Sequence, residues 1–78
     1  MNFEVVSRTK LEGNSEELII KIDKNNLQLL GYVLETIEGM CYYSTIDKDK
    51  DDSRVKIIYT IDFKADIDKI LQSIKEHE

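Results

Sequence analysis

The sequence of 78 residues contains no proline, no tryptophan, one histidine and one cysteine. The lack of proline excludes a slow folding phase caused by a cis-proline bond. The single cysteine, Cys41, excludes an intramolecular disulfide and any zinc site built from several cysteines. One reduced thiol is typical of a cytoplasmic protein, and we expect that location. No basic segment followed by an apolar run opens the chain, and apolar runs are short, so we expect neither a signal peptide nor a membrane span.

Basic residues are scarce relative to acidic ones, with 11 lysines and arginines against 16 aspartates and glutamates, for a net charge of −5. Such a surface repels phosphate backbones, so we expect no nucleic-acid partner. Tyr42, Tyr43 and Tyr59 could stack on RNA bases, but the basic, glycine-containing aromatic motif of RNA-recognition domains is absent. A hydrophobic content of 41% supports one folded domain, residues 1–78. The core of such a short chain is small, and oligomerisation would add to its stability.

Apolar periodicity divides the chain into six elements. Alternation predicts strands over residues 3–11 and 17–23, and β-branched and aromatic residues predict two more over 40–46 and 54–61. Leucines at helical spacing predict a helix between residues 23 and 39, with Asn25 or Asp23 as its N-cap. A second amphipathic helix follows the last strand and includes Ile67, Ile70, Leu71 and Ile74.

The order β-β-α-β-β-α predicts an α+β two-layer sandwich of the ferredoxin-like type, with an antiparallel sheet and two helices on one face. The ferredoxin-like order ends with a strand after its second helix, and this sequence has none there. We expect residues 3–11 to take the place of that strand, which would make the fold a circular permutation.

Strand alternation also predicts which side chains face away from the helices. We expect Tyr42 and Tyr59 to contribute to the helix-facing core, with their hydroxyls at its edge. The opposite face is predicted to display five apolar or weakly polar residues: Val6, Ile19, Cys41, Tyr43 and Ile58. Clustered apolar groups on a face that would otherwise meet water indicate a covered surface, in a homodimer or against a protein partner. The alternative is a set of scattered exposed apolar residues, which is common on protein surfaces.

The segment TIDKDKDDSR, residues 45–54, spaces Asp47, Asp49 and Asp51 like the first half of a calcium-binding loop. An EF-hand loop needs glycine at its sixth position and glutamate at its twelfth, and this chain has Asp52 and Ile58 there. We interpret the segment as a solvated turn between two strands and expect no metal site.

Residues suited to catalysis are also few. Cys41 would need a neighbouring base and a lowered pKa, and the only histidine, His77, lies next to the C-terminus. No phosphate-binding glycine loop and no paired-carboxylate cleft is visible. We expect no enzyme activity, no catalytic residues and no cofactor.

Residues 17–74 resemble the ACT-type regulatory domains. The stretch IIKIDKNNLQLLGYVLETIEG is similar to their first strand, turn and helix, with Asp23 at the strand end and Leu27 entering the helix. The chain has Asn25 and Asn26 where those domains carry proline and glycine. The resemblance implies that a small-molecule site, for an amino acid, would lie at this turn and use Asp23, Asn25, Asn26 and Leu27.

The same pattern is also similar to a small bacterial family of standalone domains of unknown function. We therefore expect a non-enzymatic module that self-associates or docks a protein partner through its open sheet face. The alternative is an ACT-like regulatory domain that binds an amino acid.

Overall fold

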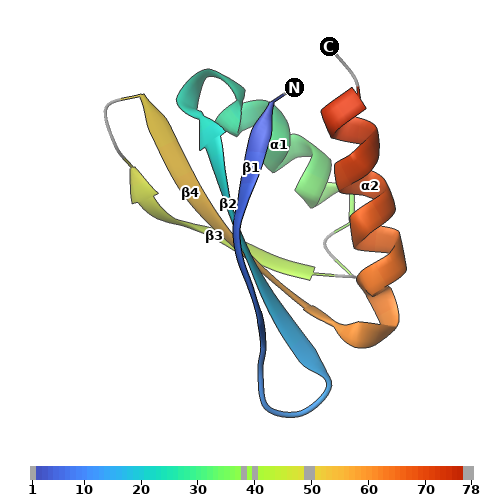
Figure 1. The fold of residues 1–78 in the computed structure, drawn as a ribbon. Helices are drawn as coiled ribbons and strands as arrows, with labels where there is room; N and C mark the ends of the chain where they lie inside the picture. Colours follow the sequence, from blue (N-terminus) through green and yellow to red (C-terminus); the bar gives the residue numbers. More distant parts are fainter. Residues whose placement is uncertain (1, 38, 40, 49–50, 77–78) are drawn as a thin grey trace.

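A computed structural model describes residues 2–37, 39, 41–48 and 51–76, which form four strands and two α-helices in two layers (Figure 1). The elements are, in chain order, β1 (Phe3–Lys10), β2 (Ser15–Asp23), α1 (Lys24–Glu35), β3 (Cys41–Lys48), β4 (Asp52–Thr60), a 3-10 turn η1 (Ile61–Phe63) and α2 (Lys64–Glu76). The predicted element order and the α+β class are confirmed. None of the described helices is long and apolar enough to cross a membrane.

The four strands form one antiparallel sheet in the order β1-β2-β4-β3. The predicted first strand is present as β1, which pairs with β2 along an edge of the sheet. Gly13 lies in the connection between them with φ of 74°, a left-handed conformation that glycine adopts without steric cost. Both helices lie over the same face of the sheet, which leaves the other face without a covering element among the described residues (Figure 1).

The core lies between the helices and the two central strands. Alternate residues of β2 and β4 point into it, and each helix contributes one apolar stripe. The buried hydrophobic residues are Leu18, Ile20, Ile22, Leu30, Leu34, Val55, Ile57, Tyr59, Ile67, Leu71 and Ile74. In β2 and β4, buried residues alternate along the sequence with more exposed ones, because one side of each strand faces the helices and the other does not.

Helix α1 begins at Lys24, with Asp23 as its N-cap. A carboxylate oxygen of Asp23 accepts a hydrogen bond of 2.8 Å from the backbone nitrogen of Asn25. Of the two N-caps that the sequence allowed, Asp23 is therefore the one used, and it satisfies a backbone donor that the helix leaves open.

The two ends of the described chain lie close together (Figure 1). The ammonium nitrogen of Lys75, in the last turn of α2, lies 5.4 Å from the centroid of the Phe3 ring at the start of β1. This distance is within the range of a cation–π contact. The N-terminal strand and the C-terminal helix are thus neighbours.

A β-bulge changes the face assignment in β1. Before the bulge, Val5 is opposite Ile20 on the helix side; after it, Ser7 is opposite Ile19 and Arg8 is opposite buried Leu18. The extra residue inverts the alternation. A strict period of two over residues 3–11 predicts Phe3 and Arg8 on opposite sides of the strand. That prediction is wrong, because the bulge brings Arg8 to the side of the sheet that carries the helices.

Candidate functional site

The sheet face opposite the helices, called the open face here, carries an oblique apolar stripe. Strand register places Tyr42 directly opposite Ile58, and Ile58 diagonally beside Ile19. Val6 lies in the β1 bulge, between Val5, which is opposite Ile20, and Ser7, which is opposite Ile19. The exposed fraction is 64% for Tyr42 and 45% for Val6, while Ile19 and Ile58 are half-buried. Directly opposite and diagonal side chains on one face are close enough to form a continuous surface.

Two residues predicted for this face lie on the other one. Tyr43 is opposite buried Ile57, and Cys41 is opposite buried Tyr59, so both are on the helix side. The Tyr43 hydroxyl donates a hydrogen bond of 3.4 Å to the backbone oxygen of Gly31 in α1. Conversely Tyr42, which was predicted for the core, lies on the open face. The pairing of β3 with β4 decides which side chains of β3 face the helices. Successive side chains of β3 resemble one another in polarity, so the sequence does not show which of them face the helices.

The open face mixes basic with acidic side chains although the protein is acidic. One cross-strand row reads Glu4, Lys21, Arg54 and Asp47, with acids at the two ends and bases in the middle. Lys56 and Glu17 lie among the apolar residues of the stripe on the same side of the sheet. The nitrogen of Lys21 is also 3.6 Å from a carboxylate oxygen of Asp52. Charge repulsion is therefore weaker at this face than the net charge implies.

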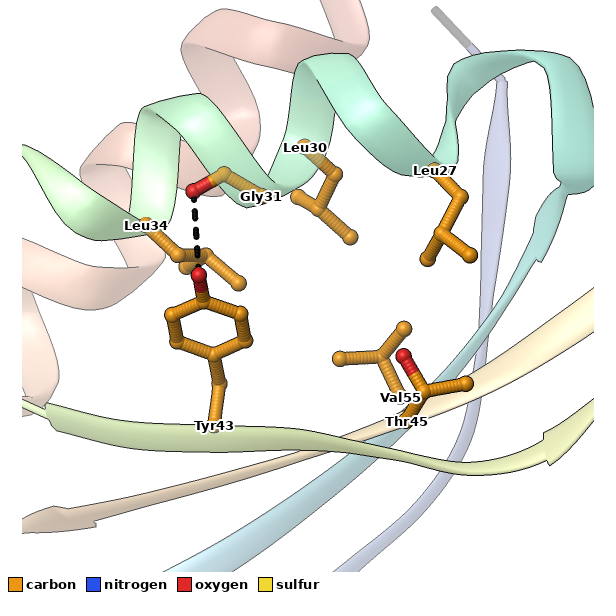
Figure 2. Close-up of a pocket in the computed structure, with 7 residues that line it drawn as sticks. All are labelled: Leu27, Leu30, Gly31, Leu34, Tyr43, Thr45 and Val55. Atoms are coloured by element: carbon orange, nitrogen blue, oxygen red, sulfur yellow. Dashed lines mark hydrogen bonds between the residues drawn. The ribbon is translucent and has the colours of Figure 1, made fainter.

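A small apolar pocket lies between α1 and the edge strand β3 (Figure 2), on the helix side of the sheet. Its volume is about 120 Å³, and it is lined by Leu27, Leu30, Gly31, Leu34, Tyr43, Thr45 and Val55. Pockets for drug-sized ligands usually enclose about 300–1,000 Å³. The pocket is therefore large enough for a side chain or a very small molecule.

The four residues predicted for an amino-acid site are only partly brought together. Leu27 points into the pocket under α1 (Figure 2), whereas Asp23, Asn25 and Asn26 are absent from its lining. The carboxylate of Asp23 is engaged in capping the helix, and Asn25 is exposed. Among the described residues, the polar groups of the turn therefore do not share the apolar pocket with Leu27.

A polar cluster that sequence reasoning missed joins β1, β2, β4 and α2. Arg8 donates hydrogen bonds of 2.9 Å to Glu16, 2.7 Å to the Tyr59 hydroxyl and 3.0 Å to Asp68. The Tyr59 hydroxyl also donates a short hydrogen bond to Glu16. Glu16 and Tyr59 are buried. The alternation of the sequence places Arg8 on the wrong side of β1, so only knowledge of the bulge would have revealed the cluster.

The cluster shifts the pKa values of two of its members in opposite directions. The hydrogen bond from Tyr59 holds the pKa of Glu16 below its usual value, against the effect of burial and with help from Arg8. Burial raises the pKa of Tyr59, and its hydrogen bond to Glu16 adds to the rise. The charged carboxylate of Glu16 and the neutral phenol of Tyr59 are thus the stabilised forms. Each of these buried polar groups has a hydrogen-bond partner, as expected of a cluster that stabilises the fold.

The other sequence candidates have ordinary surroundings. Burial raises the pKa of the Cys41 thiol, the direction that disfavours the reactive thiolate. Asp47 lies in β3 and Asp52 begins β4, while Asp49 and His77 lie outside the described residues. Across the described parts of the chain, no three histidine, cysteine or acidic side chains gather in a way that could hold a metal ion.

Residues 20–77 match the model of a protein family described as a Domain of unknown function (DUF4911). The matched region runs from the middle of β2 through α2 and leaves β1 outside. No curated protein and no solved structure matches the chain. The match covers more than half of the sequence, and the protein therefore belongs to the DUF4911 family of domains of unknown function.

Proposed function

We propose that this protein is a non-enzymatic interaction module of the cytoplasm that self-associates through the open face of its sheet. The observation that carries the proposal is the apolar stripe of Ile19, Ile58 and Tyr42 on a face that neither helix covers. Continuous exposed apolar surface on a small domain is typical of an interaction site. The Cys41 thiol, whose pKa is raised, and the structural role of the Arg8 cluster both favour a role without catalysis.

A second copy of the chain fits this face for two reasons. The bases Lys21, Arg54 and Lys56 offset most of the charge of the acids Glu4, Glu17, Asp47 and Asp52, which reduces the repulsion between two copies. A chain of 78 residues also gains only about 3–5 kcal/mol from one core, and burial of a further apolar face would add to that stability.

The fold belongs to the same proposal. We interpret it as a ferredoxin-like sandwich with an ACT-like core, permuted so that β1 occupies the position of the usual last strand. The strand order β1-β2-β4-β3 and the closeness of Phe3 to Lys75 support this interpretation. If β1 is an integral strand, deletion of residues 1–12 should abolish cooperative unfolding. Unchanged stability of the truncated chain would refute the permutation.

The test of self-association uses two substitutions of exposed or half-buried residues by glutamate. Ile58→Glu places a charge in the centre of the stripe, and we expect it to weaken association by more than about tenfold. Leu29→Glu is the matched control, because Leu29 is 50% exposed on α1, on the other side of the molecule. Sedimentation equilibrium measures the two dissociation constants, and circular dichroism checks that both variants remain folded. Equal association of both variants would contradict a role for the open face.

A second candidate function is the binding of a small molecule such as an amino acid. The observation that favours it is the apolar pocket beside Leu27 (Figure 2), one of the residues that the resemblance to ACT domains implies. Its volume of about 120 Å³ and the engagement of Asp23 in helix capping make it the weaker candidate. A thermal-shift screen against the common amino acids separates self-association from amino-acid binding. Stabilisation of the protein by one amino acid would favour the binding of a small molecule.

A further inference from the structure

We infer that the outer edge of β3, together with the pocket between α1 and β3, accepts an extended segment of a partner protein that carries an aliphatic side chain between basic residues. The segment would add to the sheet as another strand. Main-chain hydrogen bonds give affinity in this mode of recognition, and pockets for alternate side chains give specificity.

The β3 edge has few of the features that prevent strand addition. β3 is the terminal strand of the sheet, and within the described residues it pairs with β4 alone. Its register is regular from Cys41 to Thr45, and the bulge comes only between Thr45 and Asp47. No proline, lysine or acidic residue interrupts residues 41–46. Natural sheets usually block an edge with such residues or with bulges, and this stretch lacks them.

The opposite edge of the sheet is protected by the same criteria. β1 has its bulge near its centre, between Val5 and Ser7, and carries charged residues along its length. The helix layer is also attached to this edge, through the ion pair of Arg8 with Asp68 at 3.0 Å. Strand addition is therefore expected at β3 and not at β1.

The pocket beside β3 fits one aliphatic side chain. Tyr43 and Thr45 form its floor on the strand side, and Leu27 and Gly31 form its wall on α1 (Figure 2). Its volume of about 120 Å³ is a little smaller than the ~150 Å³ of an apolar cavity that accepts benzene. Every second residue of an added strand points to the helix side. A valine, leucine or isoleucine at such a position could therefore enter the pocket.

Charge determines the residues that flank the aliphatic side chain. A carboxylate oxygen of Glu35 lies 3.3 Å from the Tyr43 hydroxyl, at one end of the pocket. Asp47 lies exposed at the other end of the strand, and the whole protein has a net charge of −5. Complementary partners of such a site carry lysine or arginine on both sides of the apolar residue.

The test uses the full chain labelled with ¹⁵N and peptides about seven residues long, a usual strand length. The peptides carry lysine at both ends, threonine or serine between, and valine, leucine or isoleucine at the centre. We expect the amide signals of residues 41–45 and of Gly31 to shift, with a dissociation constant of about 1 mM or lower. Central aspartate, terminal glutamates or N-methylation of alternate backbone nitrogens should each weaken binding by about tenfold or more.

Protein variants localise the site. Gly31→Leu directs a side chain from α1 into the pocket and should weaken peptide binding by about tenfold, whereas Ala65→Leu, at an exposed position of α2, should not. Three results would overturn the inference: no shift at residues 41–45 with any peptide, binding that survives N-methylation, or concentration-dependent shifts of β3 without peptide that leave Ile19 and Ile58 unchanged. The last result would mean that a second copy occupies the edge. The peptide series remains decisive if Gly31→Leu fails to fold.

Discussion

Ile57 and Ile58 are neighbours in β4, yet their side chains lie on opposite faces of the sheet. Ile57 is fully buried, between Leu18 on β2 and Tyr43 on β3, beneath the helices. Ile58 is half-buried on the open face. The two side chains are identical, so the difference between them comes only from the helix layer. The comparison separates residues that build the fold from residues that are available for association.

The largest expected difference between the faces is in stability. Ile57→Ala should lower the free energy of unfolding by about 2–5 kcal/mol, because it leaves a cavity in the core. Ile58→Ala should lower it by less than about 1 kcal/mol, because its surroundings are partly solvent. Urea denaturation at low protein concentration, where association is negligible, measures both values. Equal losses would show that the open face is part of a core.

A smaller difference is expected between two tyrosines. Burial raises the pKa of Tyr59, so the stability that its neutral hydroxyl provides is present below about pH 10, the ordinary tyrosine pKa, and is lost as the pH rises further. Tyr59→Phe should lower stability at neutral pH by about 0.5–1.5 kcal/mol and weaken the alkaline decline.

Tyr42→Phe, on the open face, is the matched control. It should leave both the neutral stability and the alkaline decline close to those of the unaltered chain, because its side chain is 64% exposed. Thermal unfolding followed between about pH 8 and 11 checks both variants. A decline that persists in full in Tyr59→Phe would exclude Tyr59 as its source.

The smallest effect should be visible in acid and compares Glu16 with its neighbour Glu17. The pKa of Glu16 is lowered in the folded protein, so the stability it provides is present above the ordinary glutamate value of about 4.3 and is lost as the pH falls through the folded value. Glu16→Gln should therefore reduce the fall in melting temperature between about pH 5 and 3. Glu17→Gln, on the open face, should retain the fall, and identical profiles would contradict the role of the Arg8 cluster.

The parts of the fold that could be predicted are those with a clear sequence pattern. β2 and β4 alternate strictly between buried and partly exposed residues, so their faces could be assigned from the sequence. The helices could be placed from the spacing of Leu30, Leu34, Ile67 and Leu71, all of which are buried.

The errors have local physical causes. The bulge in β1 inverts the alternation after Val5, so Arg8 and its cluster could not be placed from a period of two. In β3, the run of Cys41, Tyr42 and Tyr43 has no polar residue to mark the solvent side, and only the pairing with β4 fixes it. Of the predicted interface residues, Ile19 and Ile58 lie on the open face, Cys41 and Tyr43 lie on the helix side, and Val6 lies in the bulge.

The most direct test of the central proposal is the mass of the full chain in solution as a function of concentration. Self-association through the open face predicts a mass that rises toward twice that of the monomer in the micromolar range, measured by sedimentation equilibrium or light scattering. It also predicts that the amide signals of Ile19, Tyr42 and Ile58 shift along with the mass. A monomer mass at every concentration up to the high micromolar range would contradict the proposal.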